Sequence, residues 1–203
     1  MPGKTVRFNT PSPSHSVASL PEIDGSVSPQ RIPAVMLPAV DCQINPVLHH
    51  SRSSSSPIKW NMTCPVGTAL LHPSWAQSYW SSPATNPFVT HLVIIFGAWR
   101  ITVVPHPASN VAYVTVLDVL HGIYRYLRST SSERNFQALS PDKQRRVTNA
   151  YNYRWQRCQI PAEREVEQKK GVKEIDFLAD STVFWGLSPT KELGTWKLEV
   201  SHS

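Results

Sequence analysis

VAYVTVLDVLHGIYRYLRS, residues 111–129, carries the clearest amphipathic helix pattern of the chain. Thr115 is a good N-cap, and Asp118 three residues later completes a capping-box pattern. Apolar side chains then recur at helical spacing on one broad face, formed by Leu117, Leu120, Tyr124 and Leu127 and widened by Val116, Val119 and Ile123. Burying each large side chain is worth about 1.5–3 kcal/mol, so this face must cover a sheet or another helix.

Strand patterns lie on both sides of this helix. Upstream, LVIIF at 92–96 and WRITVV at 99–104 flank Gly97-Ala98, which predicts a β-hairpin, and residues 58–62 alternate as a short strand. Downstream, residues 172–178, 183–187 and 196–200 alternate with a period of two and predict an antiparallel meander.

A second long helix is predicted from Pro141 to about residue 159. Ser140 is its N-cap and Pro141 takes the first helical position, and the charged residues 163–170 continue it beyond Pro161. Strands, two helices and further strands indicate an α+β fold. We expect an antiparallel or mixed sheet of about five to six strands, with the two main helices packed on one face.

Residues 1–57 are rich in serine and proline and are predicted to be a largely disordered leader. Residues 35–48 contain enough apolar side chains to dock on the domain, and residues 58–203 are expected to form a single globular domain. The 203 residues allow one domain with tails, and no apolar run is long enough to span a membrane.

Lys4, Val6 and Phe8 form a K-x-V-x-F sequence in the leader. It resembles the docking peptide by which many regulators bind protein phosphatase 1. Such a peptide adds to a sheet edge and places its valine and phenylalanine in adjacent pockets. The alternative is a chance match, because the motif is short and degenerate.

Four proline-directed sites, at Thr10, Ser12, Ser28 and Ser56, are candidate phosphorylation sites. Phosphates there would add negative charge to the leader and gate docking. Such pairs also occur incidentally in any linker rich in serine and proline, and the sequence leaves both interpretations open.

The net charge of +6 is concentrated in one helical region. A candidate basic patch on the second helix comprises Lys143, Arg145, Arg146, Arg154 and Arg157. Together with Tyr151, Tyr153 and Trp155 for stacking, this patch suggests nucleic-acid binding as an alternative function. A solvated helix face explains the same charges more simply.

Enzyme motifs for phosphate binding, nucleophilic catalysis and zinc are absent from the sequence. Asp118 and His121 suggest an acid–base pair, but a helix cap and a surface histidine are the simpler interpretation. Glu174 and Asp176 are expected on the solvent face of a strand. We therefore predict no catalytic residues, no metal site and no cofactor.

Cys42, Cys64 and Cys158 fit neither a zinc spacing nor a disulfide framework, which favours a reducing compartment. The N-terminus lacks the apolar region of a secretory signal. We expect a cytoplasmic or nuclear protein that is not secreted.

Several ordered blocks of residues resemble an uncharacterised domain family of basidiomycete (mushroom-forming) fungi. They cover about residues 58–200 and include Trp60, PATNP at 83–87, WRITV at 99–103, VTVLDVL at 114–120, FWGL at 184–187 and WKL at 196–198. The resemblance implies the domain boundary and a fungal, intracellular origin. It implies no catalytic residue, cofactor or ligand.

These observations together favour a non-enzymatic scaffold or adaptor that binds an unknown protein partner. A protein phosphatase 1 type catalytic subunit is one candidate for that partner. Trp75, Tyr79, Trp80 and Trp185 are candidates for an exposed aromatic patch of the kind that anchors interfaces. The alternative is that these rings complete a small core.

Overall fold

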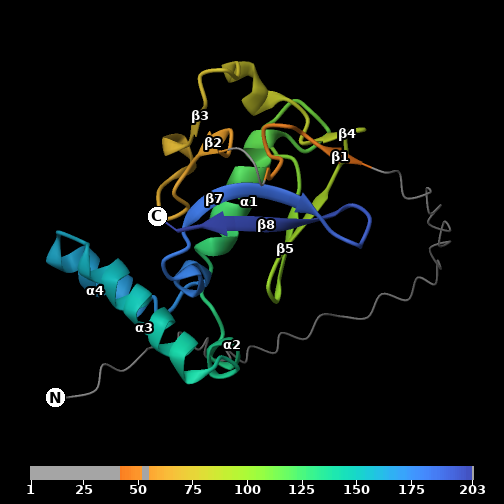
Figure 1. The fold of residues 1–203 in the computed structure, drawn as a ribbon. Helices are drawn as coiled ribbons and strands as arrows, with labels where there is room; N and C mark the ends of the chain where they lie inside the picture. The colour runs from red at the N-terminus through yellow and green to blue at the C-terminus, as the bar shows by residue number, and fades with distance from the viewer. Residues whose placement is uncertain (1–41, 52–54, 203) are drawn as a thin grey trace, which may run out of the picture.

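The computed structural model of the protein describes residues 42–51 and 55–202 (Figure 1). A four-stranded sheet lies at its centre, in the order β6-β5-β8-β7. The strands are β5 (Leu92–Phe96), β6 (Trp99–Val103), β7 (Val183–Pro189) and β8 (Thr195–Ser201). Because β5 pairs antiparallel with β6 but parallel with β8, the sheet is mixed. The predicted hairpin of residues 92–104 is confirmed.

Helix α1 (Val116–Leu127) covers one face of this sheet and lies behind β7 and β8 in Figure 1. Its capping box is confirmed, because the Thr115 hydroxyl accepts from the Asp118 amide at 3.1 Å and Asp118 Oδ2 accepts from the Thr115 amide at 3.0 Å. Leu117 does not belong to the buried stripe, since 39% of it is exposed.

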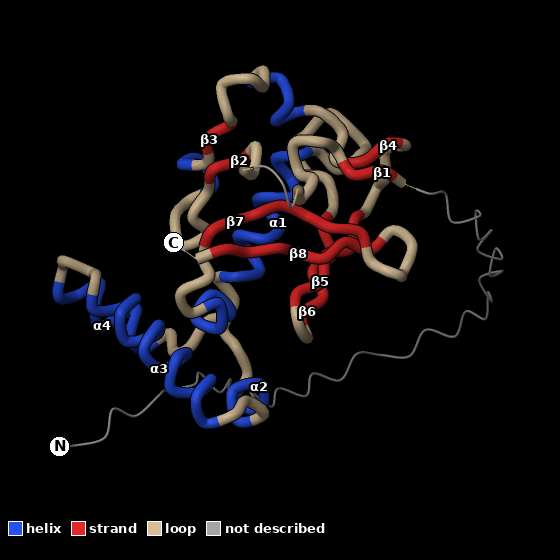
Figure 2. The backbone as a smooth tube through the Cα atoms, in the orientation of Figure 1, coloured by secondary structure: helices blue, strands red, loops and turns tan. Residues whose placement is uncertain are grey.

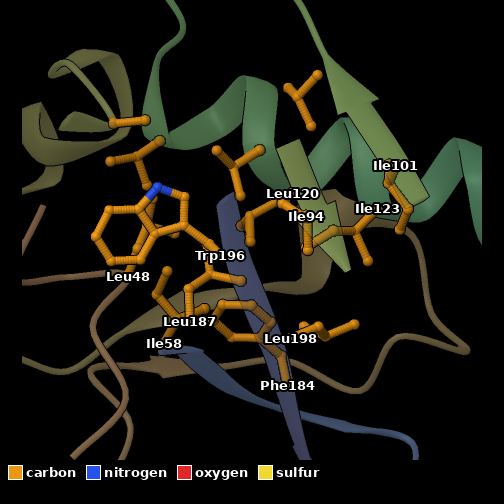
Figure 3. Packing of buried hydrophobic residues seen from close by; sticks show 14 of the residues in the cluster. Leu48, Ile58, Ile94, Ile101, Leu120, Ile123, Phe184, Leu187, Trp196 and Leu198 are labelled. Carbon is orange, nitrogen blue, oxygen red and sulfur yellow. The ribbon is translucent and has the colours of Figure 1, made fainter. Parts of the chain in front are cut away.

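The main core fills the space between α1 and the sheet (Figure 3). Leu120 and Ile123 from the helix meet Ile94, Phe184 and Leu198 from the strands, and all five side chains are completely buried. Burying each of these side chains contributes about 1.5–3 kcal/mol to the free energy of folding, which makes this interface the principal source of stability.

Two short antiparallel ribbons flank the main sheet. They are formed by β1 (Gln43–Ile44) with β4 (Thr85–Asn86), and by β2 (Ile58–Lys59) with β3 (Leu70–Leu71). Two 3-10 helices, η1 (Val66–Thr68) and η2 (Gln77–Ser81), lie between these strands. The predicted strand at 58–62 is therefore shorter than expected.

The chain before Ile58 contributes directly to the core. Val47 and Leu48 are completely buried, although both precede the family-like region of the sequence. The segment then follows the outer edge of β7, where the Leu187 amide donates to Leu48 O at 2.7 Å and the His50 amide donates to Leu187 O at 2.9 Å. Residues 35–41 of the predicted docked segment lie outside the described residues.

Helices α2 (Glu133–Gln137), α3 (Pro141–Gln156) and α4 (Pro161–Lys169) lie to one side of the α1–sheet layers, as the blue helices of Figure 2 show. α3 packs against α4 and the 3-10 helix η3 (Glu174–Leu178) instead of the sheet. A second small core there contains Val147, Tyr151 and Val172.

The strand predicted at 172–178 is wrong, because this segment forms η3. Gly171 has a φ of 73° and Ala179 a φ of 49°, so the backbone turns sharply at both ends. Only the later two segments of the expected meander pair, as β7 and β8. The predicted α+β class with a mixed sheet is confirmed. Among the described residues, no helix has both the length and the apolar character needed to cross a membrane.

Candidate functional site

A groove of about 850 Å³ runs between α3 and the body of the domain. We call it the α3 groove. Its walls come from α3, from the end of α1, from the loop of residues 61–64, and from η3 with the residues after it. The charged side chains that line it are Arg128, Arg146, Arg154, Arg157, Asp176 and Asp180.

Arg154 holds α3 against η3 at the base of the groove. Its Nε donates to Asp176 Oδ1 at 2.8 Å, and its Nη2 donates to Asp176 Oδ2 and to Gly171 O, both at 2.8 Å. Asp176 also accepts from the Lys173 amide at 2.9 Å. This carboxylate is buried and bidentate, which is the strongest arrangement of such a pair.

Glu167 on α4 joins the same ion network through contacts with Arg154, Lys170 and Lys173. Burial by itself raises the pKa of the Glu167 carboxyl, but hydrogen bonds from Lys173 and Lys170 and the charge of Arg154 lower that pKa to about 2. Burial acts to lower the pKa of Arg154, yet its contacts with Asp176 and Glu167 raise it. Arg154 and Glu167 are therefore both charged at neutral pH.

The expected solvent exposure of Glu174 and Asp176 is wrong. Both are buried in η3, Asp176 by pairing with Arg154 and Glu174 with its Oε2 left without a hydrogen-bond partner among the described residues. Burial raises the pKa of the Glu174 carboxyl. The prediction relied on strand-like alternation of polar and apolar residues. That pattern gives no information about Arg154, which lies twenty-two residues before Asp176 on another helix and pairs with it.

Two arginines of the groove have no carboxylate partner within the described part of the chain. Arg128 donates through Nη2 to Met62 O at 3.3 Å and to Thr63 O at 2.7 Å, and its guanidinium stands 4.4 Å from the Tyr124 ring centre. Arg157 is exposed and lies 5.4 Å from the Tyr153 ring centre. Both are positive charges to which the described residues offer no carboxylate.

The predicted basic patch is divided by the fold. Arg146, Arg154 and Arg157 line the α3 groove, whereas Lys143 and Arg145 lie outside it. Arg145 pairs with Asp142 at 3.1 Å, and Arg146 pairs with Asp180 at 3.5 Å.

The aromatic side chains of α3 are also separated. Tyr151 is buried and donates its hydroxyl to Gln168 O at 2.9 Å, and Trp155 is half-buried, so neither presents a free face for stacking. Tyr153 is different, since 65% of it is exposed.

Most leader positions lie outside the described residues. This holds for Lys4, Val6 and Phe8 of the docking sequence and for the candidate phosphorylation sites Thr10, Ser12 and Ser28. Ser56 is described and is buried, and its hydroxyl accepts from the Ile58 amide at 3.3 Å. A kinase has no access to Ser56 in this folded arrangement.

The four candidate aromatic residues do not project freely. Trp75, Tyr79 and Trp80 are half-buried against the main core, with the Trp75 and Tyr79 rings edge to face at 5.0 Å. Trp185 is half-buried as well. Asp118 accepts from the His106 amide in addition to Thr115, so it acts as a structural cap. Within the described ranges, no cluster of histidine, cysteine and carboxylate side chains is suited to a metal ion.

Sequence reasoning missed the groove itself, and with it Asn61, Thr63 and Asn149 as lining residues. No local signal connects these positions, because they come together through the packing of α3 on η3.

The structure is a two-layer α+β domain with a helical unit at its side. Its candidate site is a groove that carries an excess of cations. The chain belongs to the family of unknown function DUF6699, whose profile matches residues 58–193. No curated protein and no solved structure matches the chain.

Proposed function

We propose that this chain is a non-enzymatic protein-interaction module that binds a segment of a partner protein in the α3 groove. The proposal is carried by two arginines, Arg128 and Arg157, which have no carboxylate partner among the described residues and line a groove large enough for several side chains. The exposed ring of Tyr153 at the same site adds an aromatic contact of the type that is enriched in interfaces.

The two carboxylates of the ion network, Asp176 and Glu167, are suited to positioning helices and not to catalysis. A general base needs a free lone pair near its substrate, and its pKa is usually shifted toward neutrality. Asp176 instead uses both oxygens on Arg154 and on the Lys173 amide, and the pKa of Glu167 is lowered to about 2. Both groups serve to position α3 and α4.

Nucleic-acid binding through the outer face of α3 has less support. Arg145 is paired with Asp142, and the candidate stacking residues Tyr151 and Trp155 are turned into the small core. A polyphosphate backbone requires a row of unpaired cations, each neutralising one phosphate.

A photo-crosslinking experiment tests the groove as the binding site. A photoreactive amino acid placed at Asn149, inside the groove, should capture a partner that the same group at Lys143 does not capture. Arg157→Glu should abolish the capture from position 149, whereas Lys143→Glu should leave it intact. Equal capture from both positions, or capture insensitive to Arg157→Glu, would show that the partner binds elsewhere.

The leader supports a second contact within the same function. We propose that Lys4, Val6 and Phe8 dock on a protein phosphatase 1 type catalytic subunit by adding to a sheet edge. A pull-down comparing wild type with Val6→Ala/Phe8→Ala should lose the phosphatase in the variant. Undiminished phosphatase capture by the double variant would end this part of the proposal.

A cytoplasmic or nuclear location belongs to the same proposal. The three cysteines, Cys42, Cys64 and Cys158, are free thiols, as is usual in reducing compartments. The basidiomycete origin implied by the resemblance stays a prediction.

A further inference from the structure

We infer that the ligand of the α3 groove is an acidic peptide, whose carboxylate or phosphate groups pair with Arg128 and Arg157. This inference rests on the proposed function and specifies the chemistry of the bound segment. It follows from the charges that the groove leaves unpaired, from its hydrogen-bonding side chains and from its limited extent.

Arg128 provides the first argument. Its Nη1 is buried and makes no hydrogen bond to any described residue, while Nη2 is held by the carbonyl oxygens of Met62 and Thr63. Desolvated charges in proteins are normally paired with an opposite charge, because burial removes their hydration. The described residues offer Arg128 carbonyl oxygens and the Tyr124 ring but no carboxylate. An anion in the groove would supply the missing counter-charge from the side of the guanidinium that remains exposed, since Nη1 itself is enclosed.

Arg157 provides a second cation on the opposite wall, where the end of α3 borders the groove. It is exposed, it has no acidic partner among the described residues, and its guanidinium lies against Tyr153. The planar guanidinium forms two parallel hydrogen bonds to a carboxylate or a phosphate, which favours these groups over other anions. Arg128 and Arg157 thus offer two anion contacts in one groove.

Arg146 adds a third contact that a ligand can recruit. Its present partner, Asp180, is 3.5 Å away, and both side chains are more than half exposed. Exposed ion pairs of this kind contribute little to stability, so exchange of Asp180 for a ligand anion carries a small penalty.

Amide side chains in the groove suit a peptide backbone. Within the described part of the chain, the Asn149 side chain is exposed and makes no hydrogen bond, and Asn61 uses only its Oδ1, on the amide and hydroxyl of Thr63. The free NH₂ group of each asparagine can donate to a peptide carbonyl oxygen. Tyr153 offers an apolar surface beside them.

The extent of the cationic surface argues against a nucleic acid as the ligand. Outside the groove, Arg145 forms an ion pair with Asp142, and Lys169 forms one with Glu165 within α4. Lys143 has no ion pair among the described residues but lies outside the groove, so the groove itself offers only a few cations. It can accommodate a few acidic residues but cannot follow an extended phosphate backbone.

Fluorescence anisotropy with labelled peptides tests this inference on the full chain. The probes are a short glutamate-rich peptide, the same peptide with glutamine in place of glutamate, and a version with phosphoserine. We expect the glutamate or phosphoserine peptide to bind at least about tenfold more tightly than the glutamine peptide, with affinity falling as salt is added. Comparison of the two acidic probes identifies carboxylate or phosphate as the preferred anion.

The variants make the test specific to the groove. Arg157→Glu and Arg128→Gln should each weaken binding of the preferred acidic peptide about tenfold or more. Lys143→Glu changes the charge as much as Arg157→Glu does, but at a position of α3 outside the groove, and should not weaken binding. Arg128→Gln is checked for folding by its thermal midpoint. If that variant is unfolded, Arg157→Glu decides the outcome alone.

Three results would overturn the inference. These are equal binding of the glutamine and acidic peptides, equal effects of Arg157→Glu and Lys143→Glu, and displacement of the acidic peptide by a single-stranded oligonucleotide that binds more tightly. If acidic peptides fail to bind while crosslinking from position 149 still captures a partner, the inference fails and the proposed function stands. If neither is observed, both fail.

Discussion

Replacing Arg154 with alanine should lower the free energy of unfolding by about 3–5 kcal/mol. Arg154 joins α3 to η3 through its bonds to Asp176, and besides it only the small second core packs these two elements together among the described residues. The expected magnitude follows from what the substitution leaves behind at each end of the ion network.

At one end, Asp176 loses two charged hydrogen bonds, both of 2.8 Å, and keeps one from the Lys173 amide. The Asp176 side chain is only 2% exposed, so the carboxylate becomes a buried charge without a counter-ion. At the other end, Glu167 retains Lys170 and Lys173, which limits the loss there. The total therefore depends mainly on Asp176.

Urea denaturation followed by tryptophan fluorescence measures this effect, because the chain contains seven tryptophans. Arg145→Ala is the matched control. Arg145 is on the same helix, and its pair with Asp142 is mostly exposed, so its removal should change the unfolding free energy by less than about 1 kcal/mol. The double variant Arg154→Met/Asp176→Leu should recover much of the lost stability, since it removes both charges together.

An Arg154→Ala variant within about 1 kcal/mol of wild type would refute this reasoning, and so would an effect no larger than that of Arg145→Ala. Failure of the double variant to exceed Arg154→Ala in stability would show that hydrogen bonding or packing of the arginine stem, and not the stranded charge of Asp176, dominates the loss.

Three further predictions concern pH and backbone geometry. Because burial raises the pKa of Glu174, wild type should lose stability as pH rises from about 4.5 toward neutrality. Glu174→Gln should remove this loss. Parallel pH profiles of the two proteins in thermal melts would contradict the prediction. The pKa of Glu167 is lowered from 4.5 to about 2, so its contribution is present above pH 4.5 and disappears as pH falls toward 2. The shift corresponds to about 3 kcal/mol before solvent screening and to about 1–2 kcal/mol after it, and Glu167→Gln should abolish this acid-dependent term in urea titrations at different pH values. Gly186 has a φ of 116°, and a Cβ there would lie 2.8 Å from the His50 amide nitrogen, so Gly186→Ala should destabilise the protein by about 2 kcal/mol or more. Gly67→Ala, at a site with nothing within 4 Å, is its control, and equal thermal midpoints for the two variants would disprove the predicted clash.

Local sequence determined the elements whose interactions are local. The capping box of Thr115 and Asp118 joins residues three apart, and the β5–β6 hairpin needs only the turn at Gly97-Ala98 and two alternating strands. Because each of these features is complete within a few residues, pattern reasoning located both, together with Pro141 at the start of α3.

Tertiary structure alone decided the sheet order and the site. The parallel pairing of β5 with β8 joins residues such as Val93 and Thr195, which no local pattern connects. Residues 172–178 alternate like a strand, yet Arg154 stabilises them as a 3-10 helix by binding the buried Asp176. Alternation of polar and apolar residues in the sequence shows how side chains differ in polarity, but it does not show which of them are buried. A charged side chain can be buried wherever a distant partner compensates its charge. The α3 groove has the same origin, since that ion network and the small core of Val147, Tyr151 and Val172 hold α3 beside the body of the domain.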